Sequence, residues 1–519
     1  MRWYWALPLA VVLYRVSPAL AGAPVFSVDA WPLLADSRYI LAHGAANIYP
    51  CSGLPSCYMA GWPGLVLLTS IVSSVCSLSL YWTPPVVTAA TAALSSLSIA
   101  LFGGLVSGRA RTLALLLAAV AAPVNLFYSG YKEEMFAMPM LALLLYMYAR
   151  GRLRRSWGAA GLLLAAGVIV SHHFTTFVML SALGAALAYD VTASKAGGRR
   201  HALFPAAVGG MALLYYGLQG FSPLALAGYT YGFLATLFSY NVVLFMLGWA
   251  ELSRPALGTR HLLVPAAIAA ASLLVLPSAG RQLYDPHSLL YVVPMLLFAV
   301  PVWMLSYLGV SSLSRERRPL SGILTGWMAA PLALAYMAFF DGNAILVYRG
   351  VVAALFPGVL LAAVCAGEAL KMRAGAPGGW ARRAYAAMVM VLLLSSAAAG
   401  ALAEAEPYAY GRDVLTGSTW AYPLQDALVV SQVMGRVGQN ATVYTDLSTA
   451  ALAQFVAPSA AVGGARPAGF GAEATEGVLL LSAAATDAFF YAGYGNGQAA
   501  GASPPDVVFM SAPYRAFAA

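Results

Sequence analysis

"GWPGLVLLTSIVSSVCSLSLYW", residues 61–82, is an apolar stretch whose relation to a membrane decides the fold of this chain. It belongs to a 519-residue sequence that is 61% hydrophobic and only 9% charged. Soluble domains carry about 25% charged residues, so this composition excludes a water-soluble globular protein. A spanning helix needs ~20 mostly apolar residues, and the many such runs predict an all-α polytopic membrane protein.

Lysine and arginine residues decide whether residues 61–80 cross the membrane. Cytoplasmic loops carry an excess of these residues. If 61–80 does not span, most basic residues before residue 403 fall in inner loops, whereas the excess inverts if it spans. We therefore expect an interfacial or re-entrant helix at 61–80, a cytoplasmic N-terminus, an outer C-terminus and about 13 spans. The expected spans are 3–23, 84–107, 112–128, 134–149, 156–172, 173–190, 203–218, 233–252, 262–278, 288–309, 320–340, 351–370 and 384–403. The basic residues in the outer loops are Arg38, Lys132, Arg281 and Arg349.

The first 23 residues contain one early arginine, an apolar stretch and terminal small residues. This pattern fits a cleaved signal peptide, but Arg15 interrupts the apolar run. We favour an uncleaved first helix, and in both cases residue 24 emerges on the outer side. The chain is thus predicted to be a multi-pass protein of the cell (plasma) membrane.

The composition changes after residue 403. We predict a transmembrane domain at 1–403, with an outer loop at 24–83, and a small extracytoplasmic α/β domain at 404–519. Its segments 426–438, 441–446, 449–457, 477–483 and 506–511 predict helix, strand, helix, strand and strand. The sequon at Asn440 agrees with an outer location. Cys51 and Cys57 share a polar outer loop, which predicts a disulfide, with two free thiols as the alternative.

Acidic and histidine residues gather at the predicted outer face, where charge is otherwise sparse. Ionisable groups at a membrane edge are expensive and usually functional, so this face is expected to hold the site. The residues concerned are Asp29, Asp36, His43, Glu133, Glu134, His172, His173, Asp285, His287 and Asp341.

Five stretches occur in a recognisable order. They are "VFSVDAWPLLADSRYILAHG" (25–44), "GWPGLVLLTSIVSSV" (61–75), "AAPVNLFYSG" (121–130), "YKEEMFAMP" (131–139) and "YRGVVAALFPGVLLAAVCAG" (348–367). Their order and placement resemble the GT-C superfamily of membrane glycosyltransferases, which take a sugar from a polyprenyl-phosphate carrier. The resemblance covers roughly 1–190 well and 340–370 loosely. The WWDYG motif of oligosaccharyltransferases is absent, so the protein O-mannosyltransferase and aminoarabinose-transferase types are the better analogy. The Ala-, Gly- and Arg-rich composition favours a prokaryotic source.

The resemblance implies a polyprenyl-phosphate-linked sugar as donor, with a glycan, protein or lipid acceptor, in the bilayer and without nucleic acid. Transfer needs a carboxylate that takes the acceptor proton, and the early outer-loop acid of the family corresponds to Asp29. Its alternative role is a helix N-cap. Asp36, seven residues later, shares that helix face or is a solvated surface charge, which we favour.

The twin acids Glu133 and Glu134 begin a helix at its outer end. They are expected to hold the acceptor or, with Asp29, to bind Mg²⁺ or Mn²⁺, although acids there also complement the helix dipole. Metal dependence stays open.

Basic residues supply the expected contacts to the donor phosphate. Arginine suits phosphate through its bidentate fork, and the candidates are Arg349 and Arg281, together with Lys132. The alternative for the arginines is pairing with Asp341 or Asp285.

Aromatic and imidazole side chains complete the candidate set. Of His172 and His173, at most one is expected to face the site, and both are alternatively interfacial caps. Tyr128 and Tyr131 are interpreted as an aromatic belt rather than as sugar-stacking residues.

Two other function classes compete with transfer. A transporter or flippase is typically built from internal repeats with breaks or acids in the middle of its spans. Here no internal repeat appears and the acids lie at one face. A non-catalytic scaffold of the same fold stays open.

Overall fold

The computed structural model describes residues 6–27, 29–44, 61–151, 155–193, 198–220, 231–252, 298–307, 309–310, 313, 318–340 and 344–369, parts of 387–395, and six C-terminal strand segments. The chain divides into two compact units, each described by itself below. The first contains Met1–Arg15, Thr88–Ser129 and Glu133–Glu404, and the second contains Val16–Val87, Gly130–Lys132 and Ala405–Ala519.

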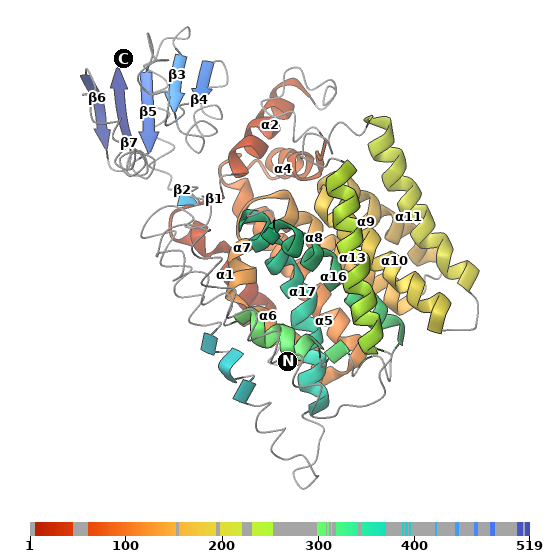
Figure 1. Ribbon diagram of the computed structural model, residues 1–519. Helices are drawn as coiled ribbons and strands as arrows, with labels where there is room; N and C mark the ends of the chain where they lie inside the picture. The colour runs from red at the N-terminus through yellow and green to blue at the C-terminus, as the bar shows by residue number, and fades with distance from the viewer. Residues whose placement is uncertain are drawn as a thin grey trace. The chain divides into compact units, whose positions relative to one another are not determined.

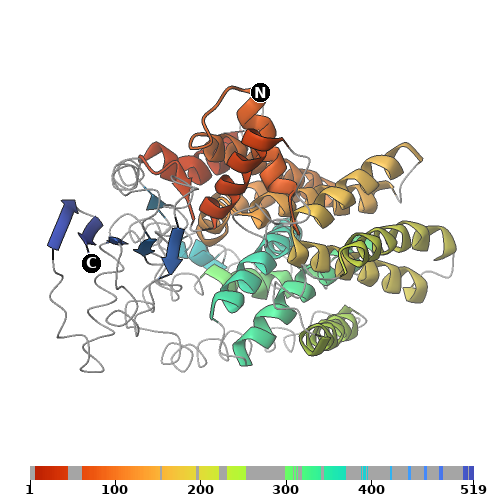
Figure 2. The same ribbon diagram turned by 90° about the horizontal axis from the view of Figure 1, so that it is seen from above.

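The first unit is a bundle of apolar helices (Figures 1 and 2). Its helices are α1 (Ala6–Leu20), α5 (Thr83–Val106), α6 (Gly108–Val120), α7 (Ala122–Phe127), α8 (Glu133–Gly151), α9 (Arg155–Ser171), α10 (His173–Ala193), α11 (Gly198–Leu218), α13 (Tyr231–Leu252), α16 (Arg318–Phe340) and α17 (Ala344–Ala369). Helices α1 and α5 contribute to both units. Helix α16 packs against α10, α13 and α17, while α8 packs on α9 and α6 packs on α17.

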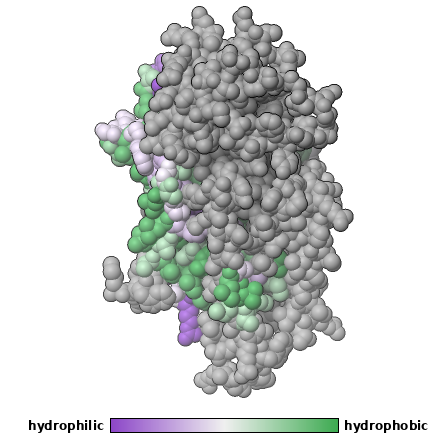
Figure 3. Space-filling model, turned by 90° about the vertical axis from the view of Figure 1, so that its left-hand side faces the viewer, coloured by the Kyte–Doolittle hydropathy of each residue, from purple (hydrophilic) through white to green (hydrophobic). Residues whose placement is uncertain are grey.

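The described part of the chain contains three helices with both the length and the composition of a membrane span: Thr83–Val106, Leu320–Ala338 and Arg349–Gly367. Other apolar helices are shorter, and several expose large apolar side chains on α9, α11 and α13. The exposed residues include Leu163, Leu203, Leu213, Leu218, Phe238 and Met246. On the face shown in Figure 3 the coloured residues are also mainly apolar. Such surfaces are typical of contact with lipid. The number of spans and the orientation stay predictions.

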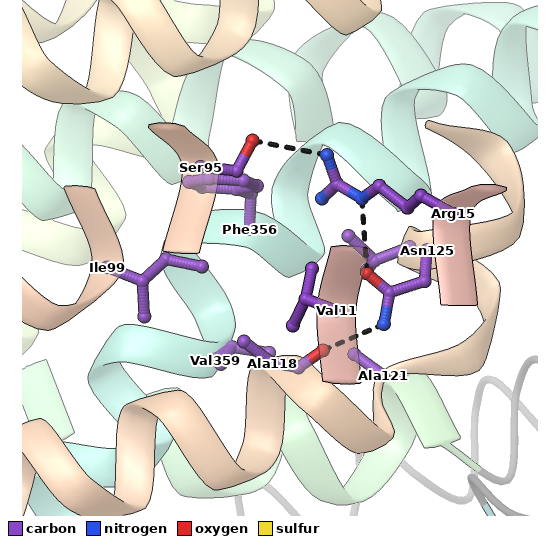
Figure 4. Close-up of a pocket in the computed structure, with 10 residues that line it drawn as sticks. Val11, Arg15, Ser95, Ile99, Ala118, Ala121, Asn125, Phe356 and Val359 are labelled. Carbon is purple, nitrogen blue, oxygen red and sulfur yellow. Dashed lines mark hydrogen bonds between the residues drawn. The ribbon is translucent and has the colours of Figure 1, made fainter. Parts of the chain in front are cut away.

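One expected span is wrong. Residues 112–128 are not one helix, because α6 ends at Val120 and α7 begins at Ala122. Pro123 lies in the first turn of α7, where proline is tolerated, but it cannot continue the preceding helix. The side-chain amide of Asn125 donates to the Ala118 carbonyl at 2.9 Å (Figure 4), so the end of α6 is satisfied from within α7.

Two glycines on α16 let α10 approach closely. Gly322 and Gly326 are four residues apart, which is the small-xxx-small spacing of tightly packed membrane helices. A Cβ atom at Gly322 would lie 2.9 Å from the Tyr189 Cβ, and one at Gly326 would overlap Ala185. The close packing of α10 on α16 therefore depends on the absence of a side chain at both glycines.

We expect Gly326→Ala to lower the melting temperature of the purified protein. Overpacking a dense contact costs about 1–3 kcal/mol, and the methyl group at this position meets Ala185 and the backbone of α10. The matched control is Gly184→Ala on α10 itself, where an added Cβ meets nothing within 4 Å. Equal melting temperatures for the two variants, measured by thermal unfolding in detergent, would contradict this packing.

The second unit contains a helix pair and the described strands. Helix α2 (Ala30–His43) packs on α4 (Gly64–Val75), and β1 (Val25–Phe26) pairs antiparallel with β2 (Ala421–Tyr422). Helix α4 has 12 residues, so it rises only about 18 Å, which is less than the ~30 Å hydrocarbon core. That length suits the interfacial role expected for 61–80.

The C-terminal strands form a mixed five-stranded sheet with the order β4-β3-β5-β7-β6. β3 pairs in parallel with β4 and β5, while β7 pairs antiparallel with β5 and β6. The bounds are β3 (Thr442–Thr445), β4 (Ala461–Gly464), β5 (Val478–Ser482), β6 (Asp506–Ser511) and β7 (Tyr514–Ala518). Three of these strands lie at expected positions, and β4 and β7 were not expected. The two expected helices, 426–438 and 449–457, lie outside the described residues, and the α/β domain at 404–519 stays a prediction.

Candidate functional site

Three charged or titratable side chains, two from helices and one from the residue between α9 and α10, meet inside the first unit. A carboxylate oxygen of Glu134, at the start of α8, lies 3.6 Å from the His172 Nε2 atom and 4.0 Å from a guanidinium nitrogen of Arg349. The side chains of Glu134 and His172 are only 6% and 5% exposed, whereas that of Arg349 is 32% exposed. The arginine is thus the member of this cluster that an incoming ligand reaches.

His172 is oriented by the start of α10. It directly precedes the helix, and its Nδ1 atom accepts a hydrogen bond from the Thr175 backbone N–H at 3.3 Å. The Thr175 hydroxyl lies 2.8 Å from the same nitrogen. When Nδ1 is an acceptor, a neutral imidazole carries its proton on Nε2, which faces Glu134. The ring of His173 packs beside that of His172, with centroids 4.7 Å apart.

Glu134 has one oxygen engaged and one available. Its first oxygen faces His172 and Arg349. Its second oxygen is buried and has no hydrogen-bond partner among the described residues. Because buried polar atoms normally find a partner, this oxygen is suited to accept a hydrogen bond from a hydroxyl group of a bound molecule. Glu133, the preceding residue, is buried as well.

The alternative pairing of Arg349 with Asp341 or Asp285 stays a prediction, because both aspartates lie outside the described residues. Arg349 also lies inside α17 rather than before it, because this helix begins at Ala344.

The aromatic-belt interpretation of Tyr128 and Tyr131 is wrong, because both side chains are 1% exposed. The Tyr128 ring covers the guanidinium of Arg15, 5.3 Å from its centroid. The Tyr131 hydroxyl bonds to the Thr69 hydroxyl, which itself donates to the Leu65 carbonyl. Burial raises the pKa of the Tyr131 phenol above its ordinary value. This phenol therefore keeps its proton and donates to Thr69.

The second unit holds the segment before α8. The Tyr131 backbone N–H donates to the Phe26 carbonyl at 2.7 Å, which joins this segment to the loop that carries Asp29. Lys132, the next residue, is buried at 3% exposure. Lysine is seldom buried unless it is paired, so Lys132 is not a solvated surface cation, and its role at the donor phosphate stays a prediction.

Asp29 occupies the position before α2 without forming a cap. Its backbone is helical (φ −66°, ψ −15°), and its side chain makes no capping hydrogen bond to the described first turn. An N-cap residue normally adopts an extended backbone and accepts such a bond. The capping role therefore lacks the contact on which it depends.

Asp36 is not a solvated surface charge, and that expectation is wrong. Its exposure is 1%. Helix α2 packs on α4, and the neighbouring Ser37 hydroxyl lies 3.2 Å from the Val66 carbonyl of α4. His43 remains exposed and stacks on Tyr39.

Several predicted residues lie outside the described part of the chain: Cys51, Cys57, Arg281, Asp285, His287, Asp341 and Asn440. Among the described residues no group of three or more His, Cys, Asp or Glu side chains is placed to hold a metal ion. The Mg²⁺ or Mn²⁺ hypothesis therefore rests on the sequence.

Several solved structures share the arrangement of this chain in space, and they identify its fold. AglB, the oligosaccharyltransferase of Archaeoglobus fulgidus, in complex with an inhibitory peptide and a dolichol-phosphate, matches 95% of this chain and 70% of its own length. The TM-score is 0.57 at 13% identity. ArnT of Cupriavidus metallidurans, bound to undecaprenyl phosphate, matches 99% of this chain and 97% of its own, with a TM-score of 0.50 at 14% identity. This chain has the GT-C fold.

The GT-C resemblance expected from the sequence is confirmed at the level of the fold. The archaeal enzyme in complex with Zn and sulfate gives a TM-score of 0.58 at 13% identity, over 94% of this chain and 69% of that chain. No family model and no curated protein matches the sequence. The GT-C fold is therefore recognised from the arrangement of the chain in space and not from sequence identity.

Proposed function

We propose that the protein is a membrane glycosyltransferase that moves a sugar from a polyprenyl-phosphate carrier to an acceptor at the outer face of the cell membrane. The observation that carries this proposal is the buried Glu134–His172 pair with the partly exposed Arg349. Such a cluster within apolar helices is expensive to build and typical of a functional site. The dolichol-phosphate of AglB and the undecaprenyl phosphate of ArnT support a carrier of this class.

The proposed reaction assigns one task to each group. The acceptor hydroxyl attacks the anomeric carbon of the sugar while its proton passes to the Asp29 carboxylate. The bond between that carbon and the phosphate oxygen breaks, and the polyprenyl phosphate leaves with the electron pair. Arg349 stabilises the charge on this leaving group, and Lys132 and Arg281 are proposed to assist it.

Glu134 positions Arg349 and offers its second oxygen to the acceptor, and Glu133 is proposed to support it. His172 holds Glu134 in place through Nε2. The acceptor is a glycan, a protein or a lipid. The proposed orientation is the one expected from the basic residues, with about 13 spans and the C-terminal domain outside.

We expect Arg349→Lys to weaken binding of undecaprenyl phosphate roughly tenfold and Arg349→Gln to weaken it further. Lysine keeps the charge but loses the bidentate fork, and glutamine loses both. Retention of the carrier by the purified protein, measured by native mass spectrometry, checks this. The matched control is Arg150→Gln at the other end of α8, where the arginine bonds to the Tyr146 hydroxyl. Equal weakening by the Arg150 and Arg349 variants would overturn the assignment.

A further inference from the structure

Ser27 has an unusual backbone conformation two residues before Asp29. Its φ is 100° and its exposure is 3%. Residues other than glycine rarely adopt a positive φ, and the strain persists only where the surroundings hold the residue in place. Because strained residues gather at functional sites, the contacts that hold Ser27 bear on the role of Asp29.

Ser77 also has a positive φ, of 53°, but the end of a helix explains it. It follows α4, and the Leu78 backbone N–H donates to the Ser73 carbonyl at 3.0 Å. A residue in the left-handed conformation, spanned by such a hydrogen bond, commonly ends a helix. Ser27 has no explanation of this kind, because it lies between β1 and the start of α2.

Ser27 holds the turn that carries Asp29. The Asp29 backbone N–H donates to the Ser27 hydroxyl oxygen at 3.3 Å, and the Ala30 N–H donates to the Ser27 carbonyl at 3.2 Å. Ser27 thus satisfies N–H groups at the start of α2, which otherwise lack a partner within the helix. The Asp29 side chain makes no capping hydrogen bond to the described first turn, so the start of the helix does not depend on its carboxylate.

The backbone before Ser27 is held by two segments that are distant in the sequence. The Phe26 carbonyl accepts the Tyr131 N–H at 2.7 Å, and Phe26 lies opposite Ala421 in the antiparallel pairing of β1 with β2. All of these segments belong to the second unit. A change of φ at Ser27 would rotate the contacts of Phe26 against those of Asp29, so the contacts on both sides maintain the strained conformation.

We propose that Ser27 is a positioning residue that orients Asp29, and that the pairing of β1 with β2 holds it in this conformation. The inference rests on the proposed function, because it takes Asp29 as the base. A fixed turn keeps the carboxylate in one orientation, so that no further ordering is needed when the acceptor is bound. The C-terminal region then contributes to transfer through Ala421–Tyr422, the two residues of β2.

Ser27→Gly tests the positioning role in the full-length protein. Glycine adopts a positive φ without strain, so the melting temperature should not fall. The turn nevertheless loses the hydroxyl and becomes less restricted, and a misplacement of about 1 Å can cost 10²-fold in rate. We expect transfer at saturating carrier to fall roughly tenfold or more, with unchanged affinity for undecaprenyl phosphate. Ser77→Gly is the matched control, because it makes the same change at the other positive φ, and it should leave transfer unchanged.

Backbone amide exchange gives a second readout that does not depend on sugar transfer. Ala421→Pro removes an N–H from β2, so it should weaken the pairing with β1 and lower transfer. Hydrogen–deuterium exchange of the peptide that covers residues 25–31, measured by mass spectrometry, should be faster in Ser27→Gly and in Ala421→Pro than in the wild type. Ala461→Pro is the control, because it makes the same change on β4, which pairs with β3 in the other sheet. It should leave this exchange unchanged.

The outcomes separate this inference from the proposed function. Near-normal transfer by the folded Ser27→Gly protein, while Asp29→Asn is inactive, would overturn the positioning role and leave the proposed function in place. Unchanged exchange of residues 25–31 in both Ser27→Gly and Ala421→Pro would also overturn it. A wild-type protein that transfers no sugar would contradict the proposed function, and the exchange measurement would then decide whether Ser27 and β2 hold the turn.

Discussion

Asp29→Asn is expected to reduce sugar transfer by about 10²–10⁴-fold, which is the usual contribution of a general base. Asparagine keeps the size of the side chain but cannot take the acceptor proton. Because the Asp29 side chain makes no capping bond to the described first turn of α2, its replacement should leave the helix and the melting temperature nearly unchanged. Transfer rates at saturating carrier, with binding of undecaprenyl phosphate measured in parallel, check this prediction.

The matched control for Asp29 is Asp36→Asn on the same helix. It removes the same charge, but from a position that is 1% exposed. A buried site should respond through stability, so we expect a changed melting temperature with transfer per folded molecule within a few-fold of wild type. Near-normal transfer by Asp29→Asn, or parallel losses of expression in both variants, would contradict the base assignment.

Glu134→Gln is expected to lower transfer by about 10²-fold, the scale of a misplaced catalytic geometry. Glutamine keeps the shape, but Arg349 and His172 lose the carboxylate that lies 4.0 and 3.6 Å from them. The measurement is transfer rate together with carrier affinity, since a misdirected Arg349 should affect both.

Glu133→Gln tests whether Glu134 acts through Arg349 and His172 or only through a favourable interaction with the helix dipole. Both acids lie in the first turn of α8, so a dipole effect would make the two substitutions equal, at less than ~1 kcal/mol each. We expect Glu133→Gln to be at least tenfold milder than Glu134→Gln. Equal effects of the two substitutions would remove the special role of Glu134.

The sequence predicts the helices well where long apolar runs end at glycine, proline or charge. The expected 134–149 and 173–190 correspond to α8 (Glu133–Gly151) and α10 (His173–Ala193). The break between α6 and α7 was readable from Pro123. The Gly322–Gly326 spacing, although visible in the sequence, gains its meaning only from the neighbouring α10.

Burial of individual side chains was predicted poorly. In an apolar chain most helix faces carry apolar residues, so the sequence does not tell a lipid-facing surface from the interior. This is why Asp36, Tyr128 and Tyr131 were expected at surfaces, whereas all three are buried. The pairing of Glu134 with His172 and Arg349 joins residues far apart in sequence, which only the packing of α8, α10 and α17 determines.

The central claim is that this protein transfers a sugar from a polyprenyl-phosphate carrier. Its most direct test incubates the purified wild-type protein with radiolabelled polyprenyl-phosphate sugars and candidate glycan, protein and lipid acceptors. Asp29→Asn and Asp36→Asn are run in parallel. The account predicts that label leaves the carrier and enters an acceptor with the wild type and with Asp36→Asn, but not with Asp29→Asn. Label that stays on the carrier with the folded, carrier-binding wild type across these donors and acceptors, or that moves equally with Asp29→Asn, would contradict it.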